Sequence, residues 1–397
     1  MIQGWPLVLR LGSAQTLAWA STYYLPAIIA PAMAQDLGLP VSRIWLAFSL
    51  ALVVSALLGP LAGRNIDRWG GRPVLILSSG LFAAGLLGLS AARGSTGLVL
   101  AWLLLGVAMG GGLYEAAFAA LVRLQGLGAR ASITGITLVA GFASTVGWPL
   151  SSLLQAEFGW RWTCVAWAVL HLLVGLPLNA GLPRAEQVGA PLPAATPNGT
   201  APAPSTSTAP APPHRWTAPL LSFVFAVAWF NSTAMAAHLP RLLMASGLTL
   251  AAAVGVAALV GPAQVAGRLL EFGVLRRWHP LLSARLATVT HPLGVLVLVV
   301  VGPAAAPVFA LLHGAGNGIL TIAKGTLPLL FYGPQGYGLR QGLIMAPGRF
   351  LQAFAPLVFG AGLERWGNGA FWITGTLAAG AWLALMALHA PGHRPGS

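Results

Sequence analysis

The chain has 397 residues and a net charge of +14, yet only 7% of its residues are charged and 57% are hydrophobic. An average soluble domain carries about 25% charged residues, because a surface in water needs polar cover. This composition excludes a soluble enzyme and favours a protein surrounded largely by lipid. Nucleic-acid binding is excluded because the basic residues stand singly between apolar runs. The single cysteine, Cys164, excludes an intrachain disulfide.

Long apolar runs predict an all-α membrane protein with twelve spanning helices. A spanning helix needs about 20 mostly apolar residues, and lipid offers no partner for an unpaired backbone group. In the first half the expected spans are 7–32, 43–63, 73–92, 97–122, 131–155 and 160–182. In the second half they are 217–243, 250–270, 281–301, 304–331, 340–362 and 368–390.

The arginines and one proline-rich segment organise these spans. Most arginines fall on one side if the N-terminus is cytoplasmic, which predicts that both termini face the cytoplasm of a bacterial inner membrane. The segment between the two halves is rich in Pro, Ala, Ser and Thr and predicts a flexible or extended linker. The expected divisions are therefore a six-helix bundle over 1–183, a cytoplasmic linker over 184–215 and a second six-helix bundle over 216–397.

The two halves repeat a short pattern. Gly63, Arg64 and Asp67 follow the second span, and Gly267, Arg268 and Glu271 follow the eighth span with the same spacing. Such an internal repeat predicts two bundles related by a pseudo-twofold axis normal to the membrane. That arrangement suits alternating access, in which one half rocks against the other around a shared site.

The stretch from 63 to 72, Gly-Arg-Asn-Ile-Asp-Arg-Trp-Gly-Gly-Arg, resembles the loop 2–3 motif of the major facilitator superfamily. The resemblance implies a secondary transporter without an ATP site or a cofactor. The stretch 238–243 is similar to the monocarboxylate and oxalate/formate branch, although the acidic-aromatic pattern of its first span is missing. The residues expected to gate the two bundles are Gly63, Asp67, Arg68, Gly70, Arg72, Gly267, Arg268 and Glu271. Asp67 and Arg68 are expected at a helix end in the interface, where a charge pair can hold the two bundles together.

Glu115 is the one acidic residue expected inside a span. A charged side chain at the centre of the bilayer costs about 2.5–3.5 kcal/mol on insertion scales, so its presence indicates a function. One interpretation is a proton carrier that couples transport to a pH gradient. The other is a fixed counter-ion of Lys324, Arg64 or Arg123. Pseudo-symmetry places Lys324 near the counterpart of Glu115.

Polar residues at helical spacing predict a water-accessible central chamber. The resemblance implies that spans 1, 4, 7 and 10 line it, and the spacing supports this independently. The residues expected to bind substrate are Tyr23, Tyr24, Asn231, His238, His313, Asn317, Lys324 and Arg349. The alternative for the uncharged members is hydrogen bonding between helices. Because Lys324 and Arg349 are both cationic, we expect a small organic anion such as a monocarboxylate.

Other functions stay open at this point. The 15 Trp and 15 Phe fit a drug or amphipath exporter, although an aromatic belt at the membrane interfaces explains them equally. Met235, His238 and His313 suggest metal transport, but soft ligands are too few for a metal cage, and no metal is expected. A non-transporting receptor is a third alternative. No catalytic residues are expected, and the expected partners are lipid, a small-molecule substrate and a proton, with the chain a monomer.

Overall fold

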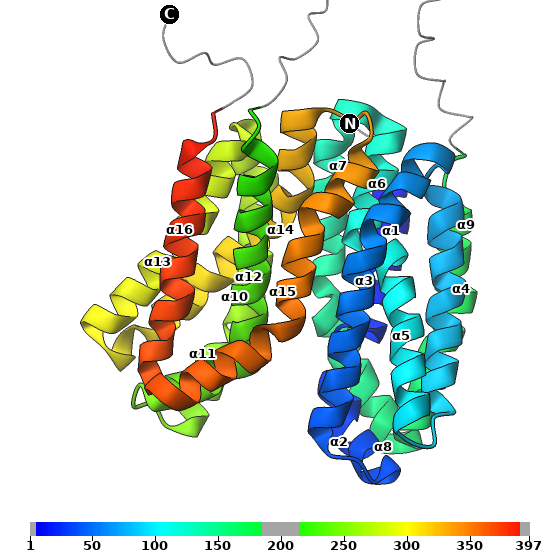
Figure 1. The fold of residues 1–397 in the computed structure, drawn as a ribbon, viewed down its shortest axis with the longest axis horizontal. Coiled ribbons are helices and arrows are strands. Elements are labelled where there is room, and N and C mark those ends of the chain that lie inside the picture. Colours follow the sequence, from blue (N-terminus) through cyan, green and yellow to red (C-terminus); the bar gives the residue numbers. More distant parts are fainter. Residues whose placement is uncertain (1–4, 185–213, 390–397) are drawn as a thin grey trace, which may run out of the picture.

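The computed structural model describes residues 5–184 and 214–389, and this part of the chain forms helices and no strands. Figure 1 shows two helical bundles side by side. The first bundle contains α1 (Trp5–Ser21), α2 (Pro26–Leu37), α3 (Val41–Trp69), α4 (Gly71–Ser90), α5 (Ser95–Gly112), α6 (Tyr114–Gln125), α7 (Ala129–Val139), α8 (Ala143–Leu170) and α9 (Leu176–Ala180). The second contains α10 (Thr217–Ala245), α11 (Leu250–Ala258), α12 (Val260–Gly273), α13 (Pro280–Val301), α14 (Ala306–Tyr332), α15 (Tyr337–Trp366) and α16 (Phe371–Ala387).

The helices confirm an all-α membrane fold of twelve spans in two bundles. Within the described residues, eight continuous helical stretches are long and apolar enough to cross a membrane. Two of these stretches, Ser95–Ala180 and Tyr337–Ala387, each contain more than one predicted span. The first predicted span is absent from the eight because a turn divides it into α1 and α2, with 17 and 12 residues.

Breaks divide the predicted spans 7–32 and 97–122, and local sequence explains both of them. Pro26 has no backbone N–H and stands at the first position of α2, where a helix tolerates proline. Three glycines end α5 at Gly112, and Leu113 is extended, with φ −92° and ψ −169°. The carbonyl of Gly112, left without a helical partner at this break, accepts a buried hydrogen bond of 2.7 Å from Nε2 of Gln15. The break makes Tyr114 the start of a new helix inside the membrane.

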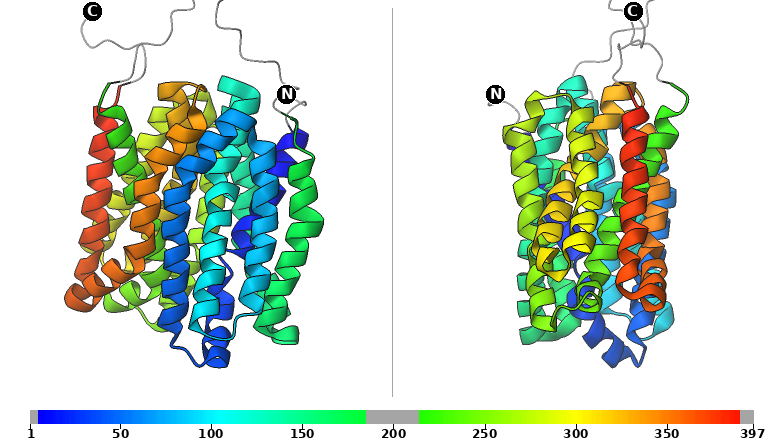
Figure 2. Two further views of the ribbon diagram at one scale, coloured as in Figure 1. Left: turned by 45° about the vertical axis from the view of Figure 1, so that its right-hand side comes forward. Right: turned by 90° about the vertical axis from the view of Figure 1, so that its left-hand side faces the viewer.

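We call the end of the molecule at which α1 begins and α16 ends the terminal end (Figures 1 and 2). Trp5, at the start of α1, contacts Phe272, near the end of α12, with ring centroids 6.2 Å apart. The predicted linker, 184–215, lies almost entirely outside the described residues.

Large apolar side chains cover the outside of both bundles as well as their cores. Leu57, Leu173, Val300 and Leu357 are each at least 70% exposed, although each lies within a helical segment. Exposed aliphatic side chains in this number are unfavourable in water and favourable against lipid tails. The exterior therefore fits a hydrocarbon environment, and the polar residues at the bundle interface are the exception that needs explanation.

Candidate functional site

Asp67 joins the two bundles at the terminal end. Its carboxylate accepts hydrogen bonds of 2.8 Å from the backbone N–H groups of Gly338 and Leu339, at the start of α15. These N–H groups have no partner within their own helix, and the helix dipole favours a negative charge there. The approach depends on glycine, because a methyl group on Gly63 would collide with the backbone of Gly338.

The two charged residues of this helix end differ in their surroundings. Asp67 bonds to the start of α15, whereas Arg68 is exposed and lies over the ring of its neighbour Trp69, 5.4 Å from the centroid. Gly70 occupies a positive φ of 84° that allows the tight turn from α3 into α4. Arg72 follows this turn and is half-buried.

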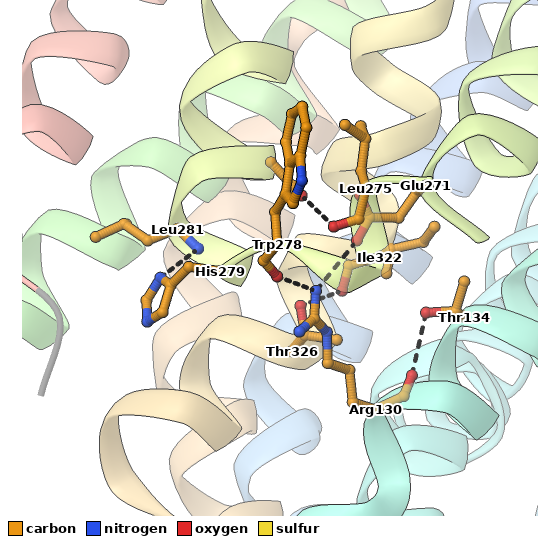
Figure 3. Close-up of polar contacts among 10 residues, drawn as sticks. Arg130, Thr134, Glu271, Leu275, Trp278, His279, Leu281, Ile322 and Thr326 are labelled. Carbon is orange, nitrogen blue, oxygen red and sulfur yellow. Dashed lines mark hydrogen bonds and ion pairs between the residues drawn. The ribbon is translucent and has the colours of Figure 1, made fainter. Parts of the chain in front are cut away.

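The second copy of the motif joins the bundles at a related place. Glu271 of α12 is 3% exposed and lies 3.6 Å from Arg130 of α7, measured from Oε1 to Nη2 (Figure 3). Arg130 also donates a hydrogen bond of 3.2 Å to the carbonyl of Trp278. The guanidinium of Arg268 lies directly against Gly141 of the opposite bundle. Gly267 differs from Gly63, because it packs on α14 of its own bundle.

Glu115 forms an ion pair with Arg349 at the middle of the bundle interface. Glu115 lies in the first turn of α6, directly after the break at Leu113, and the positive end of that helix favours its carboxylate. Its Oε2 lies 2.5 Å from Nη2 of Arg349 on α15. Arg349 is 3% exposed. The ion-pair partner of Glu115 is therefore Arg349, and not one of the predicted counter-ions Lys324, Arg64 and Arg123.

Lys324 lies behind this ion pair, against an aromatic ring. Its Nζ is 3.5 Å from the ring centroid of Trp229, and the guanidinium of Arg349 lies 5.1 Å from the same centroid. Such contacts stabilise a cation by about 2 kcal/mol or more where water is excluded. Trp229 of α10 therefore contacts both cations, which come from α14 and α15, at the surface where the bundles meet.

Tyr23 adds a further polar link between the bundles. Its hydroxyl accepts a hydrogen bond of 2.9 Å from Nε2 of Gln352 and lies 3.2 Å from Oγ1 of Thr233. Tyr24 belongs to the same turn but points to α8, where its ring packs against Trp148 at 5.7 Å. Of the two predicted tyrosines, Tyr23 contacts the opposite bundle.

Four other predicted substrate residues make their polar contacts inside the second bundle. Asn231 donates to the carbonyl of Thr374, and Asn317 donates to Oγ of Ser232. His238 lies 2.8 Å from the carbonyl of Pro356, and His313 lies 2.8 Å from His291, both through ring nitrogens. Asn231, His291, His313 and Asn317 line a small cavity within this bundle. His313, Asn317 and Lys324 all lie on α14, but His313 and Asn317 contact their own bundle, whereas Lys324 lies near the bundle interface.

Trp229 and Arg130 were not predicted from the sequence, whereas Trp19 and Gln352 were expected on the polar faces of the chamber but not as substrate ligands. The two tryptophans carried a usable signal, because each stands near the middle of its predicted span rather than at a membrane interface. Gln352 shares a helical face with Arg349. For Arg130 no sequence signal distinguishes it from the other basic residues of its loop.

The fold and this polar seam define a multi-pass membrane protein with the architecture of a two-bundle transporter. The family model of the Major Facilitator Superfamily matches residues 11–323. The fold is similar to the human organic anion transporter MFSD10 (TETRAN), at a TM-score of 0.71 and 16% identity over 97% of this chain and 100% of that one. It is also similar to the proton:xylose symporter XylE bound to 6-bromo-6-deoxy-D-glucose, at a TM-score of 0.73 and 12% identity over 96% and 95% of the chains.

One curated relative matches part of the sequence. An "uncharacterized 38 kDa protein in 23S RNA operon" of Thermoproteus tenax is 33% identical over 154 residues. That match spans 38% of this chain and 40% of the relative, so the chain covers less than half of its length. The family model covers most of the chain, and the chain therefore belongs to the Major Facilitator Superfamily. Its members are transporters that bind small-molecule substrates, and an enzymatic activity is not indicated.

Proposed function

We propose that this protein is a proton-coupled transporter of a small organic anion that works by alternating access. The observation that carries the proposal is the ion pair of Glu115 and Arg349, which joins the two bundles inside the membrane. An ionisable pair at this depth is costly and is expected at an ion or substrate pathway. An organic anion transporter and a proton symporter among the structures of similar fold agree with this chemistry, as an analogy of fold.

The coupling follows from competition for Arg349. When Glu115 takes up a proton, its carboxyl group becomes neutral and its attraction to the guanidinium falls. Arg349 is then available to a substrate carboxylate, which a guanidinium can bind through two parallel hydrogen bonds. One proton and one monoanion enter together, so the net charge of the site is the same before and after. Lys324 adds a second positive charge that attracts the anion.

Alternating access requires that the contacts at the terminal end break. Asp67 must release the start of α15, and Glu271 must release Arg130, before that end can open. We place the terminal end in the cytoplasm of a bacterial inner membrane, because exposed arginines such as Arg64 and Arg68 gather there. A monomer suffices as the transporting unit, because the residues of the seam all come from one chain.

Uptake into proteoliposomes tests the coupling. We expect an imposed pH gradient, acid outside, to drive accumulation of labelled carboxylates beyond the passive entry seen in protein-free liposomes. Glu115→Gln keeps the hydrogen bond to Arg349 but carries no proton, so gradient-driven accumulation should fall at least tenfold while exchange of preloaded substrate continues.

Glu157→Gln is the matched control, because Glu157 is an exposed carboxylate on α8 of the first bundle. It should accumulate substrate as the unchanged protein does. Gradient-driven accumulation that survives in Glu115→Gln would show that Glu115 is not the coupling residue. Transport of hydrophobic cations instead of anions would contradict the proposal as a whole, since Lys324 and Arg349 repel cations.

A further inference from the structure

Two tryptophans meet at the centre of the bundle interface. Trp19 of α1 and Trp229 of α10 lie with ring centroids 6.3 Å apart and planes 14° from parallel. They are 5% and 8% exposed. Tryptophan in membrane proteins gathers at the water interfaces, where its N–H finds a partner. Two indoles at mid-depth, one from each bundle, therefore indicate a local role.

Buried polar atoms without a hydrogen-bond partner belong to these indoles and to nearby residues of α15. The Nε1 atoms of Trp19 and Trp229, Nη1 of Arg349 and Oε1 of Gln352 are all buried and make no hydrogen bond. The first three are donors, and buried donors in native proteins almost always have an acceptor. A ligand that carries acceptor oxygens would supply what this cluster lacks. A carboxylate fits best, because it offers two acceptor oxygens and a negative charge.

Flat apolar surfaces continue from the donors. The ring of Trp19 lies 5.0 Å from Tyr114 and 5.2 Å from Tyr23, measured between centroids. Tyr114 in turn stacks on Phe118 at 5.4 Å and 14°. Aromatic surfaces of this kind gain more from a planar ring than from an aliphatic group of equal size. Tyr114 directly precedes Glu115 in the chain, so a ring that packs on this surface and a carboxylate at Arg349 would bind at one place.

We propose that the substrate is an aromatic monocarboxylate. The carboxylate of the substrate replaces Glu115 at Arg349 and accepts hydrogen bonds from the indole N–H groups. The ring of the substrate packs against Trp19 and Trp229. A single negative charge follows from the charge balance, because one anion replaces the one charge that Glu115 loses on protonation. This inference rests on the proposed function and narrows it to one class of anion.

Binding to the purified protein in detergent tests the substrate class without interference from passive diffusion of weak acids. We would measure the thermal stability of the unchanged protein against increasing concentrations of four compounds. They are 4-hydroxybenzoate, cyclohexanecarboxylate, lactate and benzamide. The first should bind at least tenfold more tightly than the two aliphatic anions, and neutral benzamide should not bind.

The outcomes separate the two proposals. Equal binding of lactate, cyclohexanecarboxylate and 4-hydroxybenzoate would overturn the aromatic preference and leave anion transport in place. Tight binding of benzamide would also overturn it, because the ring would then be recognised without the charge. If no carboxylate binds and none is accumulated in proteoliposomes, the proposed function itself fails.

Variants of Trp229 locate the preference. Trp229→Leu removes the ring and should reduce the tenfold preference for 4-hydroxybenzoate to less than threefold. Trp229→Phe keeps a ring and should keep the preference, with weaker binding because the N–H is lost. Trp102→Phe is the matched control, since Trp102 is fully buried in the first bundle against Phe48. An unchanged preference in Trp229→Leu would overturn the assignment, and the compound series on the unchanged protein remains decisive if this variant does not fold.

Discussion

Asp67 closes the terminal end with one side chain. Two charge-assisted hydrogen bonds hold it to the start of α15, and each such bond is worth about 1.5–3 kcal/mol. Asp67→Asn removes the charge and one acceptor, so we expect about 1.5 kcal/mol less stability for the closed arrangement, about a tenfold shift towards the open one. Ser55 is buried and lies in the same small cavity as Glu115. A cysteine introduced there (Ser55→Cys) should therefore be labelled about tenfold faster in Asp67→Asn by a maleimide applied from the terminal end.

Asp36→Asn serves as the control for this measurement. Asp36 pairs with Arg161 at 2.7 Å, but both residues belong to the first bundle, so this pair does not hold the bundles together. Its loss should leave the labelling rate at Ser55→Cys unchanged. Similar labelling in both variants would show that Asp67 does not set the equilibrium between the two arrangements.

The sequence predicted which residues matter at this scale better than it predicted their partners. Asp67 was expected at the bundle contact because it completes a recognisable motif. Its partner is a pair of backbone N–H groups, which carry no residue-specific signal. Glu115 was expected to be functional because it is an acidic residue within a long apolar run. Its pairing with Arg349 depends on the rotation of α15 about its axis, which a helical repeat constrains only to within a turn.

The crossing of α3 and α15 is an element-scale feature that depends on glycine. A methyl group on Gly63 would collide with Gly338, whereas a methyl group on Gly59, about one turn away on α3, meets nothing within 4 Å. We expect Gly63→Ala to separate the helices at a cost of about 1–3 kcal/mol and to reduce transport more than tenfold. Gly59→Ala should transport normally. Equal activity of the two variants in proteoliposomes would contradict the tight crossing.

The start of α13 depends on the charge state of His279, which lies between two spans. Nδ1 of His279 accepts the backbone N–H of Leu281 at 3.3 Å (Figure 3). Burial, followed by the charges of Arg130 and Arg285, lowers the pKa of His279 below its ordinary 6.5. The stability that neutral His279 contributes is therefore fully present above the ordinary pKa and is lost as the pH falls through the lowered pKa.

We expect the melting temperature of the protein in detergent to fall between about pH 7 and pH 5. His279→Asn keeps a residue that caps helices well but cannot take up a proton in this range, so its melting temperature should fall less. A pH dependence as steep as that of the unchanged protein would assign the effect to other groups. The neighbouring Glu271 and Arg130 are present in both proteins and do not distinguish them.

Elements were predictable where hydrophobicity alone decides them. The spans follow from the lengths of the apolar runs, and their ends fall at glycines, prolines and charges. The breaks at Leu113 and between α1 and α2 were not predicted, because an apolar run continues across both. Glycine is frequent in membrane helices, so a glycine within an apolar run gave no reason to end a helix at Gly112. The missed break is the feature that gives Glu115 its helix start.

At the scale of the whole molecule, all the polar contacts between bundles described above lie in one seam. It runs from Asp67 and Glu271 at the terminal end to Glu115 and Tyr23 at mid-depth. The twofold repeat in the sequence predicted the first pair of these links, one from each half. It did not predict the central link, because Glu115 and Arg349 come from helices that the repeat does not relate.

Labelling from one side of the membrane tests the orientation of this seam. Exposed arginines gather at the terminal end, and the positive-inside rule places that end in the cytoplasm. Leu127 lies in the turn after α6 at the terminal end and is 70% exposed. Thr96 is exposed in the first turn of α5, at the opposite end. Each would be replaced by cysteine. In intact cells a membrane-impermeant maleimide should label Thr96→Cys and should reach Leu127→Cys only after permeabilisation. The native Cys164 is buried and should stay unlabelled in both. The reverse pattern would place the contacts of Asp67 and Glu271 on the outer side of the membrane. Asp67 and Glu271 would then close the gate through which external protons and substrate enter.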